Sequence, residues 1–233
     1  MTLRKHRLGI ILFARMSSHR LPGKMLCQVG STTLLERVVV RARLLDQPII
    51  LATSCDPSDD SLVAAANQLG LDIYRGSLHN VLDRACNAAH AAEFTAFARL
   101  CGDRPFMPLE DMQRGFRIME ESLHTSIPID LVTSALPRPV PAGLLTEVIR
   151  TDALVHLRKV AASHQEKEHV SYRFYQNPEL YNVYQLNTPL QDLTGVHLSV
   201  DSEPDRLRIS SLIAKHPDAS FPAILAANAQ SPQ

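Results

Sequence analysis

The sequence predicts an α/β fold with a largely parallel sheet, and two patterns support this prediction. Short apolar runs alternate with segments of helical periodicity from residue 8 to residue 123, which is the rhythm of successive βαβ units. The first apolar run, residues 8–14, is continuous, as expected for a strand that is buried on both faces of such a sheet. The chain has 233 residues, 45% of them hydrophobic, so we expect a single domain over residues 1–233.

The first half of the chain supplies the parallel units. Thr32 or Thr33 can cap a helix that begins near residue 34. The second helix, 58–70, has acidic residues in its first turn and Gly70 at its end. Right-handed crossovers would place the ends of the strands along one edge of the sheet. The expected strands are 8–14, 48–53, 71–74 and 95–100, and further helices are expected at 80–92 and 108–123.

The second half of the chain changes character after a predicted strand at 130–134. Residues 135–141 contain three prolines, which indicate an excursion from the sheet. We expect a smaller lid or dimer-contact subregion at about 135–190, with a strand at 144–149 and helices at 151–162 and near 168–175. A buried strand at 196–200 and a helix at 203–214 then complete the domain. Because the subregion at 135–190 has apolar helices that could form an interface, we expect a homodimer.

Composition excludes several classes of protein. Lys plus Arg and Asp plus Glu both number 24, so there is no general basic surface for a nucleic acid polymer. The cysteines form no C-x-x-C pair, which argues against a zinc ribbon, and the chain is too large to need a disulfide framework. No apolar run approaches the length that spans a membrane. The basic N-terminus imitates a signal peptide, but Arg15 interrupts it. We expect a cytoplasmic protein with reduced thiols and no membrane partner.

A cationic loop directly follows the first strand. It carries Arg15, Arg20 and Lys24, with Pro22-Gly23 as a turn signal. Open α/β sheets bind ligands at the carboxyl ends of their strands, and three cations there would suit a polyanion such as a nucleoside triphosphate. The alternative is that they are solvated surface charges. The loop lacks the spacing of a Walker A motif.

Residues 15–24, Arg-Met-Ser-Ser-His-Arg-Leu-Pro-Gly-Lys, resemble the R-M-x-S-x-R-L-P-G-K signature of the cytidylyltransferase family. The resemblance implies a three-layer α/β/α, Rossmann-like nucleotide-diphospho-sugar transferase fold. It also implies a nucleotidyltransferase that uses Mg²⁺ and CTP, transfers CMP to the hydroxyl of a small acceptor and releases pyrophosphate. The residues of this loop that are expected to bind the nucleotide are Ala14, Arg15, Ser18, Arg20 and Lys24.

Two aspartates each follow a predicted strand. Asp103 follows the strand at 95–100, and Asp201 follows the strand at 196–200. They resemble the G-D-x-P and V-D-T-P-E-D segments of the same family, in which the aspartates hold the metal. Carboxylates with water ligands are what Mg²⁺ prefers. We therefore predict that Asp103 and Asp201 act with Arg15, Arg20 and Lys24 in catalysis, although an aspartate after a strand is also a common cap or turn residue.

Further nucleotide contacts are expected at the ends of the second and third strands. Arg75-Gly76 and the Val-Leu-Asp-Arg run at 81–84 resemble the family's R-G-x-x-x-x-V-L-D-R segment. Arg75 and Asp83 would contact the nucleotide, and Gly76 would permit close backbone approach. Thr53 resembles the residue beside the base. The alternatives are an ordinary surface ion pair between Asp83 and a neighbouring arginine, with Arg84 open to either role, and a simple strand end at Thr53.

The acceptor is expected to lie against Glu147, Glu168 and His169. Glu168-His169-Val170 resembles the family's E-H-V-T segment, where a histidine could assist the attacking hydroxyl. Glu147 belongs to a stretch that resembles P-x-G-L-D-x-E-V, with Leu145 in place of the acid. The resemblance implies an acidic sugar or similar acceptor for surface polysaccharide or glycoconjugate synthesis. A sugar phosphate or phosphonate acceptor, and a non-catalytic nucleotide- or sugar-binding homologue, remain open.

Overall fold

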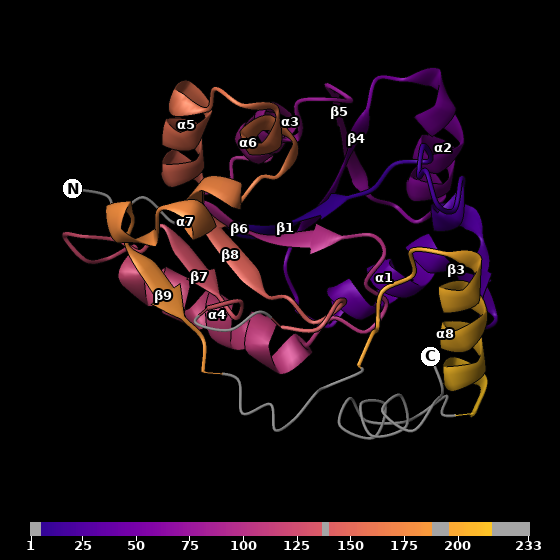
Figure 1. The fold of residues 1–233 in the computed structure, drawn as a ribbon. Helices are drawn as coiled ribbons and strands as arrows, with labels where there is room; N and C mark the ends of the chain where they lie inside the picture. Colours follow the sequence, from indigo (N-terminus) through magenta and orange to yellow (C-terminus); the bar gives the residue numbers. More distant parts are fainter. Residues whose placement is uncertain (1–5, 137–139, 188–195, 216–233) are drawn as a thin grey trace.

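The computed structural model of the chain describes residues 6–136, 140–187 and 196–215. Its centre is a seven-stranded sheet in the order β5-β4-β1-β6-β8-β7-β9 (Figure 1). A separate pair of short strands, β2 (Gln28–Val29) and β3 (Thr32–Thr33), follows the cationic loop. The strands of the large sheet are β1 (Leu8–Phe13), β4 (Ile49–Ser54), β5 (Asp72–Gly76), β6 (Ala96–Cys101), β7 (Leu131–Thr133), β8 (Glu147–Arg150) and β9 (Val183–Gln185).

Helices cover both faces of this sheet (Figure 1). In β1, Ile10 and Leu12 pack into one core, with α1, α2, α4 and α8. Ile11 and Phe13 pack into the opposite core, with α3, α5 and α7. Burial on both faces explains the continuous apolar run and confirms the three-layer α/β fold. The helices are α1 (Leu34–Arg43), α2 (Asp60–Gln68), α3 (Val81–Ala91), α4 (Leu109–Ser122), α5 (Thr151–Val160), α6 (His164–Glu168), α7 (Tyr172–Gln176) and α8 (Glu203–Lys215).

Local signals in the sequence set the ends of the early helices. The hydroxyl of Thr33 accepts a hydrogen bond from the backbone N–H of Glu36 at the start of α1, and Asn80 caps α3 in the same way. Gly70 follows α2 with a φ of +67°, a conformation that favours glycine. The predicted strands and helices up to residue 123 are therefore confirmed, with ends that shift by only a few residues.

The direction of the strands determines which chain segments meet at the site. β5, β4, β1 and β6 are parallel neighbours. β8 runs antiparallel to both β6 and β7, and Ala98 pairs with Val148. The carboxyl ends of β1, β4 and β6 and the beginning of β8 consequently lie along one edge of the sheet.

Two predictions for the second half of the chain are wrong. The helix expected near 168–175 is divided into α6 and α7, because the backbone of His169 is extended and ends α6, and α7 begins at Tyr172. A capping box formed by Ser163 and Glu166 starts α6 at His164, before the predicted start. The segment 196–200 is extended and buried but is not a strand of the sheet. Its backbone instead bonds to loops, from the N–H of Leu198 to the carbonyl of Ala142 and from the N–H of Val200 to that of Asp103, both at 2.9 Å.

The region 135–190 contributes to the central sheet instead of leaving it. β8 lies between β6 and β7, and β9, which the sequence analysis missed, forms an edge of the sheet (Figure 1). Residues 137–139 of the proline-rich stretch lie outside the described residues. The role of this region as a lid or dimer contact stays a prediction. In the described part of the chain, no helix has the length and apolar character needed to cross a membrane.

Candidate active site

A cavity of about 600 Å³ lies at this edge of the sheet. Its walls come from the loop after β1, the end of β6, the beginning of α3, the segment from α6 to α7, and Asp201. The sequence-predicted residues that line it are Ala14, Arg15, Ser18, Arg20, Lys24, Asp103, Glu168, His169 and Asp201.

The cationic loop has a defined conformation at the cavity wall. The N–H of Met16 donates to Oδ1 of Asp59 at 2.6 Å, which ties the loop to the turn after β4. The N–H of Gly23 returns to the carbonyl of Met16 at 2.9 Å. Gly23 has a φ of +73° and begins a short 3-10 helix, Lys24–Leu26. The Pro-Gly turn therefore fixes the position from which the side chain of Lys24 enters the cavity.

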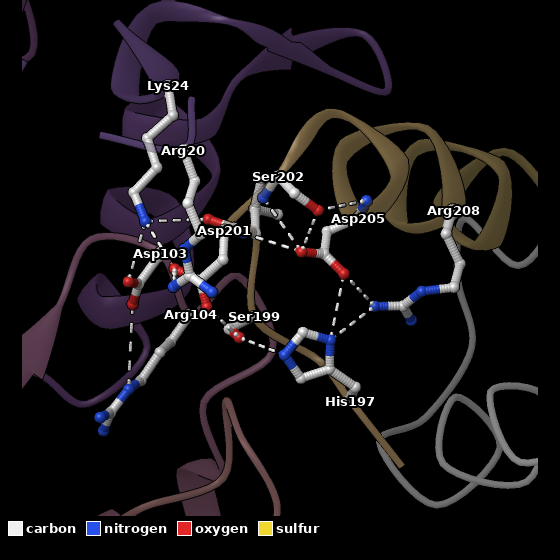
Figure 2. A network of polar contacts seen from close by, with 11 residues as sticks. Arg20, Lys24, Asp103, Arg104, His197, Ser199, Asp201, Ser202, Asp205 and Arg208 are labelled. Atoms are coloured by element: carbon white, nitrogen blue, oxygen red, sulfur yellow. Dashed lines mark hydrogen bonds and ion pairs between the residues drawn. The ribbon is translucent and has the colours of Figure 1, made fainter. Parts of the chain in front are cut away.

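Lys24 lies between the two predicted aspartates (Figure 2). Its Nζ is 3.0 Å from Oδ2 of Asp103 and 3.1 Å from Oδ1 of Asp201, and it also donates to the carbonyl of Val200 at 2.9 Å. A terminal nitrogen of Arg20 is 3.1 Å from the same oxygen of Asp201, while Arg104 is 4.0 Å from Asp103. The three segments that the sequence analysis selected therefore meet at one point.

These contacts decide the charge state of Asp201. Partial burial alone would raise the pKa of its carboxyl, but the positive charge and hydrogen bond of Lys24, the hydroxyl of Ser199 and the charge of Arg20 outweigh burial. The pKa of Asp201 is therefore below its ordinary value, so the side chain is a carboxylate at neutral pH.

The pair of aspartates has the chemistry of a hard-cation site. Oxygens from both side chains already converge on one cationic atom, the Nζ of Lys24. Within the residues that the structure describes, no group of three or more histidine, cysteine, aspartate or glutamate side chains forms a ready metal cluster. Two carboxylates that leave further positions for water and phosphate oxygens fit Mg²⁺ and do not fit a closed structural zinc site.

The cavity floor contains a buried ion pair that the sequence analysis missed. Arg99, on β6, lines the cavity and is bonded to Glu147, at the beginning of β8. The hydroxyl of Tyr175 donates to the other oxygen of Glu147 at 2.7 Å. Glu147 is fully buried and outside the cavity wall, so its predicted contact with the acceptor stays a prediction. A charged residue within the apolar strand 95–100 was the available signal for Arg99.

Glu147 is nevertheless ionised. Burial acts to raise the pKa of its carboxyl, but the Arg99 guanidinium and the hydrogen bond from Tyr175 hold it below the ordinary value. In turn, burial and the Glu147 charge raise the pKa of the Tyr175 phenol. The side chains of Arg99, Glu147 and Tyr175 therefore form a rigid floor beneath the cavity, in which Arg99 and Glu147 are charged and Tyr175 is neutral.

Arg84 is a further cation of the cavity wall. Its side chain is buried and donates to the carbonyl of Ser77 at 2.8 Å. Burial, together with the positive charge of Arg15, lowers the pKa of Arg84 to about 10, so it remains charged at neutral pH. Its Nε has no hydrogen-bond partner among the described residues. The Val-Leu-Asp-Arg run was the signal for this residue, for which the sequence left both a functional role and a surface ion pair open.

Four predicted nucleotide contacts lie outside the cavity wall, so their role in nucleotide binding stays a prediction. Thr53 is buried and donates to Asp59 at 2.9 Å, so it supports the loop anchor. Arg75 donates to the carbonyls of Ser54 and Asp56 at the end of β4 and pairs with Asp60 at 2.7 Å. A Cβ at Gly76 would come within 3.0 Å of the Arg84 side chain. Asp83 forms the ion pair that was the alternative, with Arg158 at 3.2 Å.

The predicted acceptor residues Glu168 and His169 line the cavity at the break between α6 and α7. His169 is exposed, and its ring lies 6.5 Å from that of Tyr172. Glu168 is 3.5 Å from His164. Leu145 is not part of the wall, and its carbonyl accepts a hydrogen bond from Arg104. The break in the helix thus leaves a polar rim on the cavity.

Comparisons of the sequence with known proteins identify a family and a relative. The sequence model of the family described as cytidylyltransferase matches residues 9–208. The spore coat polysaccharide biosynthesis protein SpsF of Bacillus subtilis is 31% identical over 223 residues, which cover 90% of this chain and 89% of that protein.

Two solved structures show the same fold. A cytidylyltransferase from Leptospira borgpetersenii superposes with a TM-score of 0.85 at 22% identity, covering 98% of this chain and 99% of that one. A CMP:2-keto-3-deoxy-manno-octonic acid synthetase complexed with CTP gives a TM-score of 0.68 at 18% identity, with coverage of 90% and 99%. The family match and the relative in Bacillus subtilis together show that this chain belongs to the cytidylyltransferase family of nucleotidyltransferase enzymes.

Proposed function

We propose that this protein is a Mg²⁺-dependent cytidylyltransferase that transfers CMP from CTP to a hydroxyl of an acidic sugar or similar small acceptor. Pyrophosphate is the second product, and the activated sugar serves surface polysaccharide or glycoconjugate synthesis. One observation carries the proposal. Lys24, within 3.1 Å of both Asp103 and Asp201, joins a cationic loop to two carboxylates at the mouth of a 600 Å³ cavity.

The cations of the first loop bind the triphosphate in this proposal. Arg15, Arg20 and Lys24 neutralise the phosphate oxygens, and Ala14 and Ser18 complete the loop wall. The acceptor hydroxyl forms a new oxygen–phosphorus bond at the α-phosphorus. The bond from that phosphorus to the bridging oxygen breaks, and pyrophosphate leaves with its electron pair.

Asp103 and Asp201 would hold Mg²⁺, since their oxygens already surround one cationic atom. When bound, the ion withdraws charge from phosphate oxygens and supports the departure of pyrophosphate. Lys24 bridges the two aspartates, and Asp201 is already ionised.

Glu168 and His169 form the acceptor side of the cavity in this proposal. An imidazole is a common general base at neutral pH, and that of His169 is exposed at the rim, so it can take the proton that the acceptor hydroxyl releases. The buried pair of Arg99 and Glu147 provides a rigid floor and makes no direct contact through Glu147.

The comparisons support the choice of base and pathway. One structural neighbour is a complex with CTP, and polysaccharide biosynthesis is the process in the name of SpsF. We also propose a cytoplasmic homodimer, in which the region 135–190 supplies the interface. Exposed Leu180 and Tyr184, near the β9 edge of the sheet, support this part.

Nucleotide-dependent melting tests the proposal directly. CTP with Mg²⁺ should raise the melting temperature more than UTP, ATP or GTP with Mg²⁺ do. Pyrophosphate release should then appear with an acidic sugar in an acceptor panel that also contains sugar phosphates and phosphonates, and the product mass should show one added CMP. A protein that responds to no triphosphate would refute the proposed function.

A further inference from the structure

A row of polar side chains extends from Asp201 away from the cavity (Figure 2). Oγ of Ser199 lies 3.1 Å from Oδ2 of Asp201 and 3.0 Å from Nε2 of His197. Nδ1 of His197 lies 3.1 Å from Oδ1 of Asp205, on the first turn of α8. Ser199 is only 4% exposed. None of Ser199, His197 and Asp205 lines the cavity, so the nucleotide site does not account for them.

The chemistry of the contacts fixes the direction of the hydrogen bonds. A hydroxyl has one proton to donate, and Oδ2 of Asp201 is a carboxylate oxygen that can only accept. Ser199 therefore donates to Asp201, which is a stronger bond than one to a neutral ring. The oxygen of Ser199 is then left to accept from Nε2 of His197, while Nδ1 faces the carboxylate of Asp205. Nδ1 of His197 also lies 3.3 Å from a terminal nitrogen of Arg208, so the ring is held from both sides.

Asp205 anchors the row to α8. One of its oxygens accepts from the N–H and the hydroxyl of Ser202, at 3.0 and 2.7 Å, and from the N–H of Asp201 at 3.2 Å. Its other oxygen contacts His197 and Arg208. The same helix terminus thus holds the backbone of Asp201 directly and its side chain through His197 and Ser199.

The two oxygens of Asp201 consequently have separate tasks. Oδ1 faces Lys24 and Arg20 in the cavity, and Oδ2 is held by Ser199 outside it. A carboxylate bound at both oxygens cannot rotate about its last bond without losing a contact. We propose that Ser199 and His197 are positioning residues that orient Asp201 toward the cation and phosphates. This inference rests on the proposed function, because it takes Asp201 to be a cation ligand.

Direct binding of Mn²⁺ tests the inference without relying on turnover. Electron paramagnetic resonance measures free Mn²⁺ in the presence of CTP, with and without protein. The Mn²⁺ held by CTP alone is subtracted, and the difference gives a dissociation constant for each variant. Ser199→Ala and His197→Ala should each weaken Mn²⁺ binding about tenfold, as is typical when a partner of a metal ligand is removed. His197→Gln should restore affinity to within about threefold, because an amide N–H can replace the donor of Nε2.

Ser202→Ala is the matched control. It removes a hydroxyl bond to Asp205 at the start of α8 but leaves the row to Asp201 in place. It should lower the melting temperature and leave Mn²⁺ affinity within about twofold of wild type, since its effect is on the helix cap. The inference is overturned if Ser199→Ala binds Mn²⁺ like wild type, if His197→Gln is no better than His197→Ala, or if Ser202→Ala weakens binding as much as Ser199→Ala.

Failure of the proposed function would look different. Wild-type protein that binds no Mn²⁺ with CTP, or Asp201→Asn that binds as well as wild type, would refute the cation site itself and the positioning role with it. Normal binding by wild type, loss in Asp201→Asn and no change in Ser199→Ala would refute only the positioning role.

Discussion

Glu147→Gln should destabilise the fold, because it leaves the Arg99 guanidinium beneath the cavity without its counter-charge. Glu147 is fully buried, and Arg99 has a side-chain exposure of 17%. Removing one partner of a buried ion pair costs about 3–5 kcal/mol, and the partial access of Arg99 to the cavity favours the lower end. For a domain of this size, about 3 kcal/mol corresponds to a fall in melting temperature of roughly 6–12 °C.

Urea unfolding and thermal scanning of wild type and variant measure this effect. The double variant Arg99→Met with Glu147→Leu should recover at least half of the lost stability, because packed apolar side chains can replace a buried pair. A fall of less than about 1 kcal/mol in Glu147→Gln, or a double variant less stable than Glu147→Gln, would contradict the expected role of the ion pair. A change confined to the KM for the acceptor, with unchanged stability, would instead assign Glu147 to acceptor binding.

Three further predictions concern charge, backbone and pH. Lys24→Met should weaken CTP binding about 10- to 100-fold, because it removes charged hydrogen bonds to the phosphates. Calorimetry measures the affinity, with Lys159→Met, at an exposed lysine, as the control. Equal CTP affinities of the two variants would contradict the phosphate-binding role of Lys24. Gly143→Ala should cost about 1–3 kcal/mol more than Gly70→Ala in urea unfolding, because both have positive φ but only the Gly143 Cβ would meet backbone, 2.6 Å from the Leu198 carbonyl carbon. The folded-state pKa values of Glu147 and Asp201 lie below their values in the unfolded chain, which are about 4. The two carboxylates therefore stabilise the fold above about pH 4, and this stabilisation is lost as the pH falls through the lower folded-state pKa values. A melting temperature that stays constant from about pH 6 to about pH 3 would contradict this prediction.

Local patterns were sufficient to predict the first half of the fold. Each strand there is followed by its own helix, and residues such as Thr33 and Gly70 mark helix ends within a few positions. Strand direction in the second half depends on long-range pairing, which local periodicity does not encode. No local pattern therefore indicates that β8 inserts antiparallel between β6 and β7.

The candidate site also has a part that local patterns predict and a part that depends on long-range packing. Arg20, Lys24 and Asp103 follow β1 and β6, which are neighbours in the sheet, so topology alone brings them near one another. Asp201 instead follows a segment that is not a strand of the sheet. Their detailed contacts depend on packing between distant segments. The apolar run at 196–200 was correctly predicted to be buried, yet it bonds to loops near Ala142 and Asp103 and not to a sheet neighbour.

Contact with the cavity distinguishes buried side chains that line the candidate site from those that support it, and sequence spacing does not reveal that contact. Thr53 and Glu147 match segments of the family, but both are fully buried and bonded to other side chains. Arg84, for which a surface ion pair was one alternative, instead lines the cavity. The packing of α3 against β5 determines the position of Arg84, and the pairing of β8 with β6 determines that of Glu147.

The position of Lys24 has a consequence for the order in which charges are exchanged during ligand entry. Its ammonium occupies the position between the two carboxylates, so the protein itself neutralises the charges of Asp103 and Asp201. A free divalent ion that displaced it would leave an ammonium stranded in a nearly buried position. A triphosphate arriving together with its ion offers Lys24 new oxygen partners at the same moment, so the resting protein should favour the ion–nucleotide pair over either one alone.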